Sequence, residues 1–347
     1  VEAVACVAYP HYGAVHRQGA SVMSLFQTNA WQSAWWETWG QQKGFRLIRP
    51  WDGSVSGLYE SRYMLKGILP VRSLQFVGTS YRELRTPRTE HNRFAPPDLH
   101  GQPLLRKMEG LLLESEWTEA VFNDLKTGSE ELSALVTIAA THNWAFRITA
   151  SDDAYAVETG GEFERYLASL GTNTRLRLFN RRKVLEEIGS ITHENAWPTD
   201  AEGFFEHLNR FHRARWKKNC ITPTSSEFHR RFLERIGAEG GQPQLMVMRC
   251  DDQVISVLYN VEYQGVVYNI QAGFDENFHK KVSLGSLHLG YAIEEAFRSP
   301  DVIRFDLLAG KGKKEDYKSR FANHHYQFIS VMLVKSMVFR ALYWMRG

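Results

Sequence analysis

Residues 244–318 constrain the fold more than any other stretch, because they place strands, a glycine-bearing turn and a helix in one order. Four apolar runs predict strands, and the polar pair Asp251-Asp252 predicts a hairpin between the first two. The runs cover 245–250, 254–261, 265–272 and 302–308. Between the last two runs, apolar residues recur at helical spacing from Leu287 to Phe297. This order predicts a mixed α/β fold.

The turn that precedes this helix, 280–286, has the composition of an anion-binding site. Ser283 is in the N-cap position, and Gly285 allows a ligand or another part of the backbone to approach closely. The free amides and the positive end of the dipole at a helix start favour an anion such as a phosphate. Lys280 and Lys281 add positive charge to the same turn. We therefore expect a phosphate-bearing ligand here.

The arrangement of strand, turn and helix, with Lys281-x-x-x-Gly285-Ser286 in the turn, resembles the GNAT acyltransferase superfamily. The usual signature of that superfamily is Gln/Arg-x-x-Gly-x-Gly/Ala, so the basic residue here lies one position further from the glycine. Other matching segments are Gly273-Phe-Asp275, Phe305-Asp306, Gly310, Tyr317-Lys318, Arg215-Trp216 and 181–183. Over residues 160–330 the chain is similar to the GNAT family associated with bacterial cellulose and exopolysaccharide biosynthesis. That family is related to the Fem-type aminoacyltransferases of peptidoglycan bridge formation.

The resemblance implies an acyl donor, acetyl-CoA or another acyl-CoA, whose thioester is attacked by an amine or hydroxyl of a small-molecule or saccharide acceptor. The enzyme would supply proximity, proton transfer and stabilisation of the oxyanion. Tyr317 is expected to protonate the leaving thiolate, and Asp306 to act as a general base or to orient Lys318. Core packing is the structural alternative for Tyr317, and a strand cap is the alternative for Asp306. The expected donor-binding residues are Gln271, Gly273, Lys280, Lys281, Ser283, Leu284, Gly285 and Ser286, and the expected substrate-binding residues are Arg181, Arg215 and Trp216.

The composition is that of a folded protein. Of 347 residues, 43% are hydrophobic and 23% charged, and the formal net charge of +3 is too small to indicate nucleic-acid binding by itself. The histidines form no His-Glu-x-x-His motif, and Cys6, Cys220 and Cys250 lack the short spacing of a metal site, so no metal is expected. The lack of a long apolar run and of a secretory leader predicts a cytoplasmic protein. The tail, 331–346, is expected to pack on the body, with a peripheral membrane contact as the alternative.

An internal repeat appears when 119–146 is aligned on 301–328 without a gap, because six identities then fall in register. Leu135 and Val136 occupy the places of Tyr317 and Lys318, so the first copy is predicted to be a scaffold and the second to carry the site. The predicted units are a degenerate GNAT-like half over 1–155, a basic helical linker over 156–190 and a GNAT-like catalytic half over 191–347. Each half is expected to be a twisted, largely antiparallel sheet flanked by helices.

Two features of the first half bear on its packing. Trp35, Trp36 and Trp39 recur at helical spacing and are expected to supply buried core area rather than a binding platform. The polar, proline-bearing segment 78–101 is too long for a plain turn. It is expected to be a mobile loop or a lid over a cleft.

Two other functions are open at this point. The densest positive cluster of the linker fits either a solvated face or the binding of an anionic donor. It comprises Arg175, Arg177, Arg181, Arg182 and Lys183. With aminoacyl-tRNA as the donor, the chain would be a Fem-type aminoacyltransferase. Without any donor, it would be a scaffold protein of polysaccharide assembly that keeps the fold and has lost the activity. Neither the acyl chain length nor the oligomeric state follows from the sequence.

Overall fold

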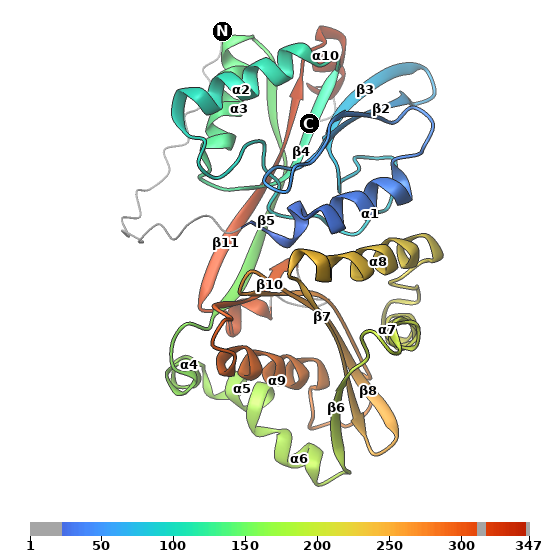
Figure 1. Cartoon of the computed structure of the whole chain (residues 1–347), viewed down its shortest axis with the longest axis vertical. Helices are drawn as coiled ribbons and strands as arrows, with labels where there is room; N and C mark the ends of the chain where they lie inside the picture. Colours follow the sequence, from blue (N-terminus) through green and yellow to red (C-terminus); the bar gives the residue numbers. More distant parts are fainter. Residues whose placement is uncertain (1–22, 311–316, 345–347) are drawn as a thin grey trace.

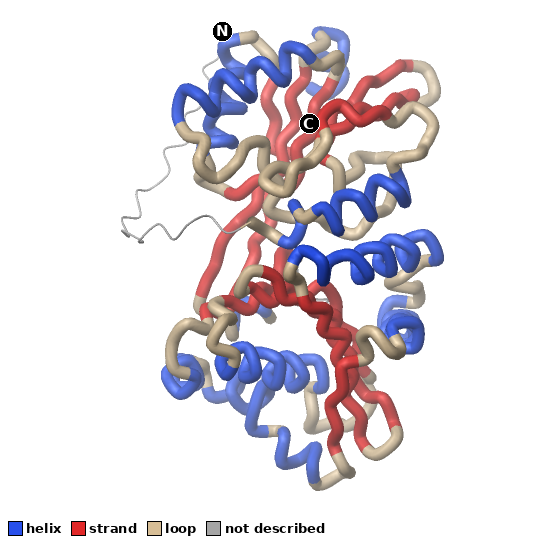
Figure 2. Tube along the Cα trace, viewed as in Figure 1, coloured by secondary structure: helices blue, strands red, loops and turns tan. Residues whose placement is uncertain are grey.

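The computed structural model describes residues 23–310 and 317–344, and it is built on one large open sheet with helices on both faces (Figure 1; Figure 2). The eleven strands lie in the order β1-β2-β3-β4-β11-β5-β10-β9-β8-β7-β6. Their bounds are β1 Arg46–Arg49, β2 Leu58–Leu65, β3 Leu69–Phe76, β4 Glu119–Lys126, β5 Ala145–Glu158, β6 Ile191–Asn195, β7 Gln242–Cys250, β8 Gln253–Tyr263, β9 Val266–Phe274, β10 Arg304–Ala309 and β11 His324–Val334. Only β3–β4 and β9–β10 are parallel. The predicted mixed α/β fold with a largely antiparallel sheet is confirmed.

The helices pack on this sheet by their apolar faces. The longer ones are α1 Asn29–Trp39, α2 Gly101–Glu114, α3 Glu130–Thr141, α7 Ala201–Trp216, α8 Pro223–Ile236, α9 Leu284–Arg298 and α10 Met337–Trp344. The shorter ones are η1 Leu25–Gln27, α4 Phe163–Ser169, α5 Thr172–Arg175, the π-helical turn η2 Leu176–Asn180, α6 Arg182–Glu186, η3 Gly237–Glu239 and η4 Lys318–Arg320. In the second half, α4, η2 and α9 cover one face of the sheet, and α7 and α8 cover the other. The site described below lies on the α9 face.

The last strand of the chain, β11, lies in the middle of the sheet between β4 and β5, two strands of the first half. Its apolar end, from Val331 to Val334, is buried within the sheet, in line with the expectation that the tail packs on the body. Beyond it, α10 packs Phe339 and Tyr343 on the sheet and exposes its first residues. Among the described helices, none has the length and apolar character needed to cross a membrane.

The two halves have the same strand order when they are followed outward from the central β5–β11 pair. On each side, the first strand pairs antiparallel with the central pair, the second pairs parallel with the first, and the third pairs antiparallel with the second. These strands are β4, β3 and β2 on one side and β10, β9 and β8 on the other. β5 runs across position 155, so both halves share one sheet (Figure 1).

Helix α1 joins the halves, because it comes from the first half and packs on α8 of the second (Figure 1). The ring of Trp31 meets the rings of Phe228 and Phe232 edge-on, each at a centroid distance of 4.9 Å. Trp35 and Trp39 are buried beside it, which confirms the predicted core role of this aromatic stripe.

The segment 78–100 has no regular secondary structure, but its middle is part of the core. Thr89, Glu90 and Asn92 are each no more than 3% exposed. The expectation of a mobile loop or lid is therefore wrong for this middle part, because these side chains could not leave without unpacking the centre of the sheet. The polar composition of the segment did not indicate this burial. The buried polar groups are tolerated because they form hydrogen bonds inside the protein.

Candidate active site

The second half of the sheet opens where the parallel strands β9 and β10 separate. They pair only from Arg304–Val266 to Asp306–Tyr268, and β9 then continues to Phe274. Beyond Asp306 the register of β10 shifts, because Leu308 has a φ of +59° in a bulge. The two strand ends diverge as a result.

Helix α9 begins beside the end of β9. Ser283 occupies the expected N-cap position, but its hydroxyl lies 3.2 Å from the hydroxyl of Ser286 and does not cap the helix. The first amides of the helix therefore keep their capacity to bind an anion. Lys280 and Lys281 are exposed in the preceding turn, whereas Leu284 is buried in the core.

Two glycines of α9 are required by packing. A Cβ on Gly285 would overlap the ring of Phe274, so the close approach expected at Gly285 comes from β9 rather than from a ligand. A Cβ on Gly290 would overlap the backbone carbonyl of Leu178. This second contact brings η2 directly against α9.

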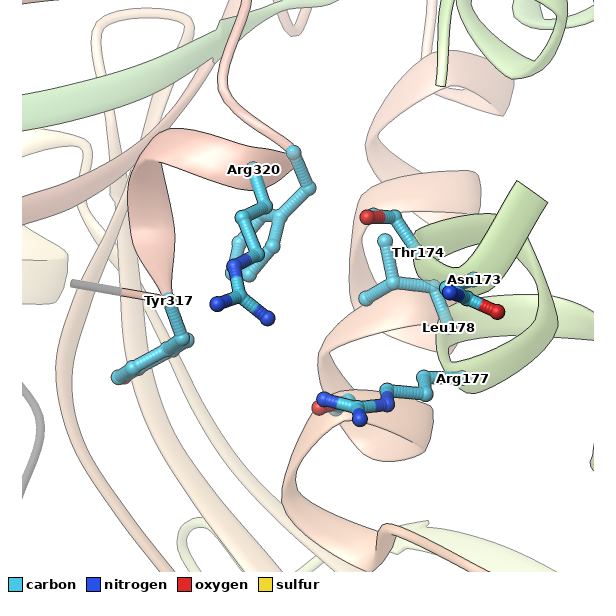
Figure 3. A pocket seen from close by; sticks show the side chains of 8 residues that line it. Asn173, Thr174, Arg177, Leu178, Tyr317 and Arg320 are labelled. Atoms are coloured by element: carbon cyan, nitrogen blue, oxygen red, sulfur yellow. The ribbon is translucent and has the colours of Figure 1, made fainter. Parts of the chain in front are cut away.

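A cleft of about 100 Å³ lies beside the first turn of α9, between η4 and the α5–η2 segment (Figure 3). It is lined by Asn173, Thr174, Arg177, Leu178, Ser286, Tyr317, Arg320 and Phe321. Arg320 and Tyr317 form one wall and Arg177 belongs to the other, with both guanidinium groups extending toward the space between them (Figure 3). Among the described residues, none that lines this cleft is acidic. The cleft is therefore positively charged and suited to phosphate.

The cleft combines residues that the sequence analysis singled out with others that it missed. Ser286 and Tyr317, both predicted site residues, lie in it although they come from different elements. Arg177 belongs to the predicted basic cluster, but nothing in the cluster distinguishes it from its neighbours. Arg320 was not predicted as a site residue, and the sequence indicates it only by its position three residues after Tyr317.

The other arginines of the basic cluster have different surroundings. Arg182 forms an ion pair with Glu294, and its guanidinium lies 3.8 Å from the ring centroid of Tyr291. These contacts hold α6 against α9. Arg181 lies at the junction of η2 and α6 and is not among the residues that line the cleft.

Lys318 is buried at the end of β10. Its ammonium donates hydrogen bonds to the carbonyls of Leu307, Leu308 and Ala309 at 2.7, 2.9 and 3.1 Å. These three carbonyls belong to the bulged strand end, so Lys318 stabilises the divergence of β10 from β9. Lys318 therefore has a structural role, although it directly follows Tyr317, which lines the cleft.

Asp306 lies on the other face of β10. Its neighbours Phe305 and Leu307 pack in the α9-side core, so alternation along the strand directs the Asp306 side chain away from α9. The carboxylate accepts hydrogen bonds from the hydroxyl of Tyr326 at 2.7 Å and from the amide of Leu308 at 2.8 Å. Asp306 and Tyr317 are thus on opposite sides of the sheet.

Gln271 and Gly273 also face away from the cleft. The Gln271 side chain lies near His212 of α7 and Cys220. A Cβ on Gly273 would lie 3.0 Å from Leu208, so this glycine allows α7 to pack on β9. Neither residue is among those that line the cleft.

Arg215 and Trp216 lie at the C-terminal end of α7. The Arg215 guanidinium is 3.0 Å from the Glu276 carboxylate and 5.2 Å from the ring centroid of Phe274. Arg215 therefore reaches the ring that packs against Gly285. Trp216 is 40% exposed.

The described residues hold no group of three or more histidine, cysteine, aspartate or glutamate side chains that could bind a metal ion.

Burial raises the pKa of the Cys220 thiol to about 11, partly offset by a hydrogen bond from Gln271. A thiol with this pKa is protonated at neutral pH and is a poor nucleophile.

The sequence and the structure were compared with known proteins. Residues 172–319 match a family model described as Acetyltransferase (GNAT) domain. A search of curated protein sequences finds no match. The crystal structure of FemX is similar in fold, with a TM-score of 0.57, 11% identity, and coverage of 92% of this chain and 94% of that one.

A conserved protein of unknown function from Bacteroides thetaiotaomicron is also similar. Its TM-score is 0.52 at 10% identity, with 91% of this chain and 93% of that one covered. At such identities these two structures establish a shared fold. The matched residues 172–319 include every residue that lines the cleft except Arg320 and Phe321, so most of the cleft lies in the part of the chain that is similar to a GNAT acetyltransferase domain.

Proposed function

We propose that this protein is an acyltransferase that moves an acyl group, such as acetyl, from coenzyme A to an amine or hydroxyl acceptor. The observation that carries the proposal is the cleft at the start of α9, where Arg177 and Arg320 face each other beside Ser286. A pyrophosphate needs cationic and N–H donors on several sides, and a helix start between two guanidinium groups supplies them. Exposed Lys280 and Lys281 extend the positive charge outside the cleft.

Transfer would be direct. The pantetheine arm would pass from the cleft toward the opening between β9 and β10, where backbone groups are freed from strand pairing. Tyr317 lines the cleft and would protonate the leaving thiolate. The acceptor would be a small molecule or a saccharide, in keeping with the resemblance to the exopolysaccharide-associated GNAT family. We expect this reaction in the cytoplasm, where acyl-CoA is formed.

Binding of coenzyme A, measured by calorimetry, tests the proposal. Arg177→Ala and Arg320→Ala should each weaken binding about 10-fold or more, because a hydrogen bond to a charged group contributes about 1.5–3 kcal/mol. Arg106→Ala is the matched control, because Arg106 is exposed on α2, the helix that occupies the place of α9 in the first half. Pantetheine, which lacks the pyrophosphate, should bind the parent and the variants equally. Equal binding of coenzyme A to all four proteins would refute the placement of the donor.

The second candidate is a Fem-type aminoacyltransferase with aminoacyl-tRNA as the donor. The similarity in fold to FemX over more than nine-tenths of both chains favours it, and a cationic cleft also fits the phosphates of RNA. Binding of aminoacyl-tRNA without binding of coenzyme A would select this function. Failure of the protein to bind either donor would favour the third function, a scaffold protein that keeps the fold without activity.

A further inference from the structure

A second group of polar side chains lies on the opposite face of the sheet from the donor cleft. Asp306 is 1% exposed and accepts hydrogen bonds from Tyr326, as described above. His91, from the segment 78–100 of the first half, lies against both residues. Its Nε2 is 3.5 Å from the Tyr326 hydroxyl and 3.8 Å from the Asp306 carboxylate. The group is located where β9 and β10 stop pairing, since Asp306 is the last residue of β10 that pairs with β9.

The His91 ring is held in place on several sides. The rings of Phe328, Tyr326 and Phe26 lie at centroid distances of 4.8, 5.6 and 6.2 Å. The backbone of His91 has a φ of +55°, a left-handed conformation, and its carbonyl accepts a hydrogen bond from the Gln27 side chain at 2.9 Å. A strained conformation that the surroundings maintain is typical of functional positions. The side chain nevertheless keeps 21% of its surface exposed, so a ligand can reach it.

The two ring nitrogens of His91 have different surroundings. Nε2 faces the Asp306 carboxylate and the Tyr326 hydroxyl, and within the described residues no group hydrogen-bonds Nδ1. Burial opposes ionisation of Asp306, but the nearby His91 ring and the hydrogen bonds from the Tyr326 hydroxyl and the Leu308 amide outweigh it and lower the pKa of the carboxyl. A carboxylate at Nε2 favours the tautomer with its proton on that nitrogen, which leaves the Nδ1 lone pair free to accept a proton. Asp124, on β4, is the other carboxylate whose charge interacts with His91.

This group and the donor cleft share one strand end. Glu90, the neighbour of His91, accepts a hydrogen bond at 3.0 Å from the backbone amide of Ala309, the last residue of β10. Lys318, the neighbour of the cleft residue Tyr317, donates to the carbonyl of the same Ala309. The two sides of the sheet are therefore connected through a single residue.

We propose that His91 is the acceptor-side base and that Asp306 and Tyr326 position it. The acceptor would lie on the Asp306 face of the sheet, while the donor lies on the α9 face. The acceptor nitrogen or oxygen would form a bond to the acyl carbon, and its proton would pass to Nδ1 of His91. The carbon–sulfur bond would break, and the thiolate would take a proton from Tyr317. The inference rests on the proposed function and deepens it, because it makes the first half a contributor to the reaction.

A reactive donor analogue, bromoacetyl-CoA, tests the placement without knowledge of the acceptor. The His91 imidazole should attack the CH₂ carbon, bromide should leave, and peptide mass spectrometry should find the adduct on His91. Excess coenzyme A should protect His91, and Arg177→Ala should slow labelling several-fold. His100 is the matched control, since it belongs to the same segment and its side chain is 65% exposed, so it should stay unlabelled. An adduct elsewhere, or none, in a protein that binds coenzyme A would overturn the placement.

The role as a base is tested by the variant His91→Asn, because asparagine tolerates the left-handed backbone at this position. Slow hydrolysis of acetyl-CoA, followed by thiol release, should fall at least 10-fold, since a positioned base typically contributes about 100-fold or more. The Kd for coenzyme A should not change. An unchanged rate of hydrolysis would overturn the base role. Absence of coenzyme A binding in the parent protein would instead refute the proposed function, and this inference with it.

Discussion

Glu90 accepts a hydrogen bond from the backbone amide of Ala309 at 3.0 Å, although 219 positions separate them in the sequence. Glu90 belongs to the irregular segment of the first half, and Ala309 ends the strand from which the second half builds its site. The same segment reaches β4, because Arg88 donates two hydrogen bonds to the carboxylate of Asp124 at 2.9 and 2.6 Å. The first half therefore contacts the end of β10, next to the cleft of the second half.

Glu90 should make stability depend on pH. Burial raises its pKa from 4.5 to about 8; Arg88 opposes this shift, and Asp124 and Asp306 add to it. The folded state thus holds a proton that the unfolded state releases, so this contribution is present below pH 4.5 and is lost as the pH rises toward and through 8. Glu90→Gln keeps an acceptor for Ala309 and cannot ionise. Urea unfolding between pH 5 and 8.5 should show a loss of a few kcal/mol in the parent that the variant lacks; parallel curves would contradict the assignment.

Gly285→Ala should destabilise the protein by about 1–3 kcal/mol, because the added methyl group overlaps the ring of Phe274. Gly110→Ala is the control, since Gly110 lies inside α2 with open space around it, and alanine there should stabilise by about 0.5–1 kcal/mol. Chemical denaturation measures both changes. Adding Phe274→Leu to Gly285→Ala should recover part of the loss. If the double variant is no more stable than Gly285→Ala, Phe274 is not the reason for the glycine.

Lys318→Met should cost about 2–4 kcal/mol of folding free energy, since it leaves the carbonyls of Leu307, Leu308 and Ala309 without their donor. Exposed Lys183→Met on α6 provides the comparison and should change stability little. A Lys318→Met protein as stable as the parent would show that these hydrogen bonds do not stabilise the strand end.

Leu135→Ala should destabilise the first half by about 2–5 kcal/mol, because Leu135 is fully buried and a cavity would remain. The adjacent Val136→Ala should be nearly neutral, since Val136 is 48% exposed on the same helix. Coenzyme A affinity per folded molecule should be unchanged in both. A large loss of affinity in Leu135→Ala at a temperature where it is fully folded would show that α3 contributes directly to the site.

Local patterns were sufficient for the elements around the cleft. The strands before α9, the helix itself and the buried tryptophans of α1 follow from apolar periodicity, which acts over a few residues. Ser286 and Tyr317 came instead from the resemblance to the GNAT superfamily. Local patterns could not distinguish a glycine that admits a ligand from Gly285, because the ring it contacts comes from another strand.

The sequence by itself determined the types of element, their order and the mixed α/β class, because each depends on neighbouring residues. Only the tertiary structure decided that β11 lies between β4 and β5, that Arg177 faces Arg320, and that His91 lies against Asp306. These relationships depend on which strands pair and on where an irregular segment is buried. The free energy that selects them comes from contacts between residues far apart in the chain, so no local stretch of sequence carries the information alone.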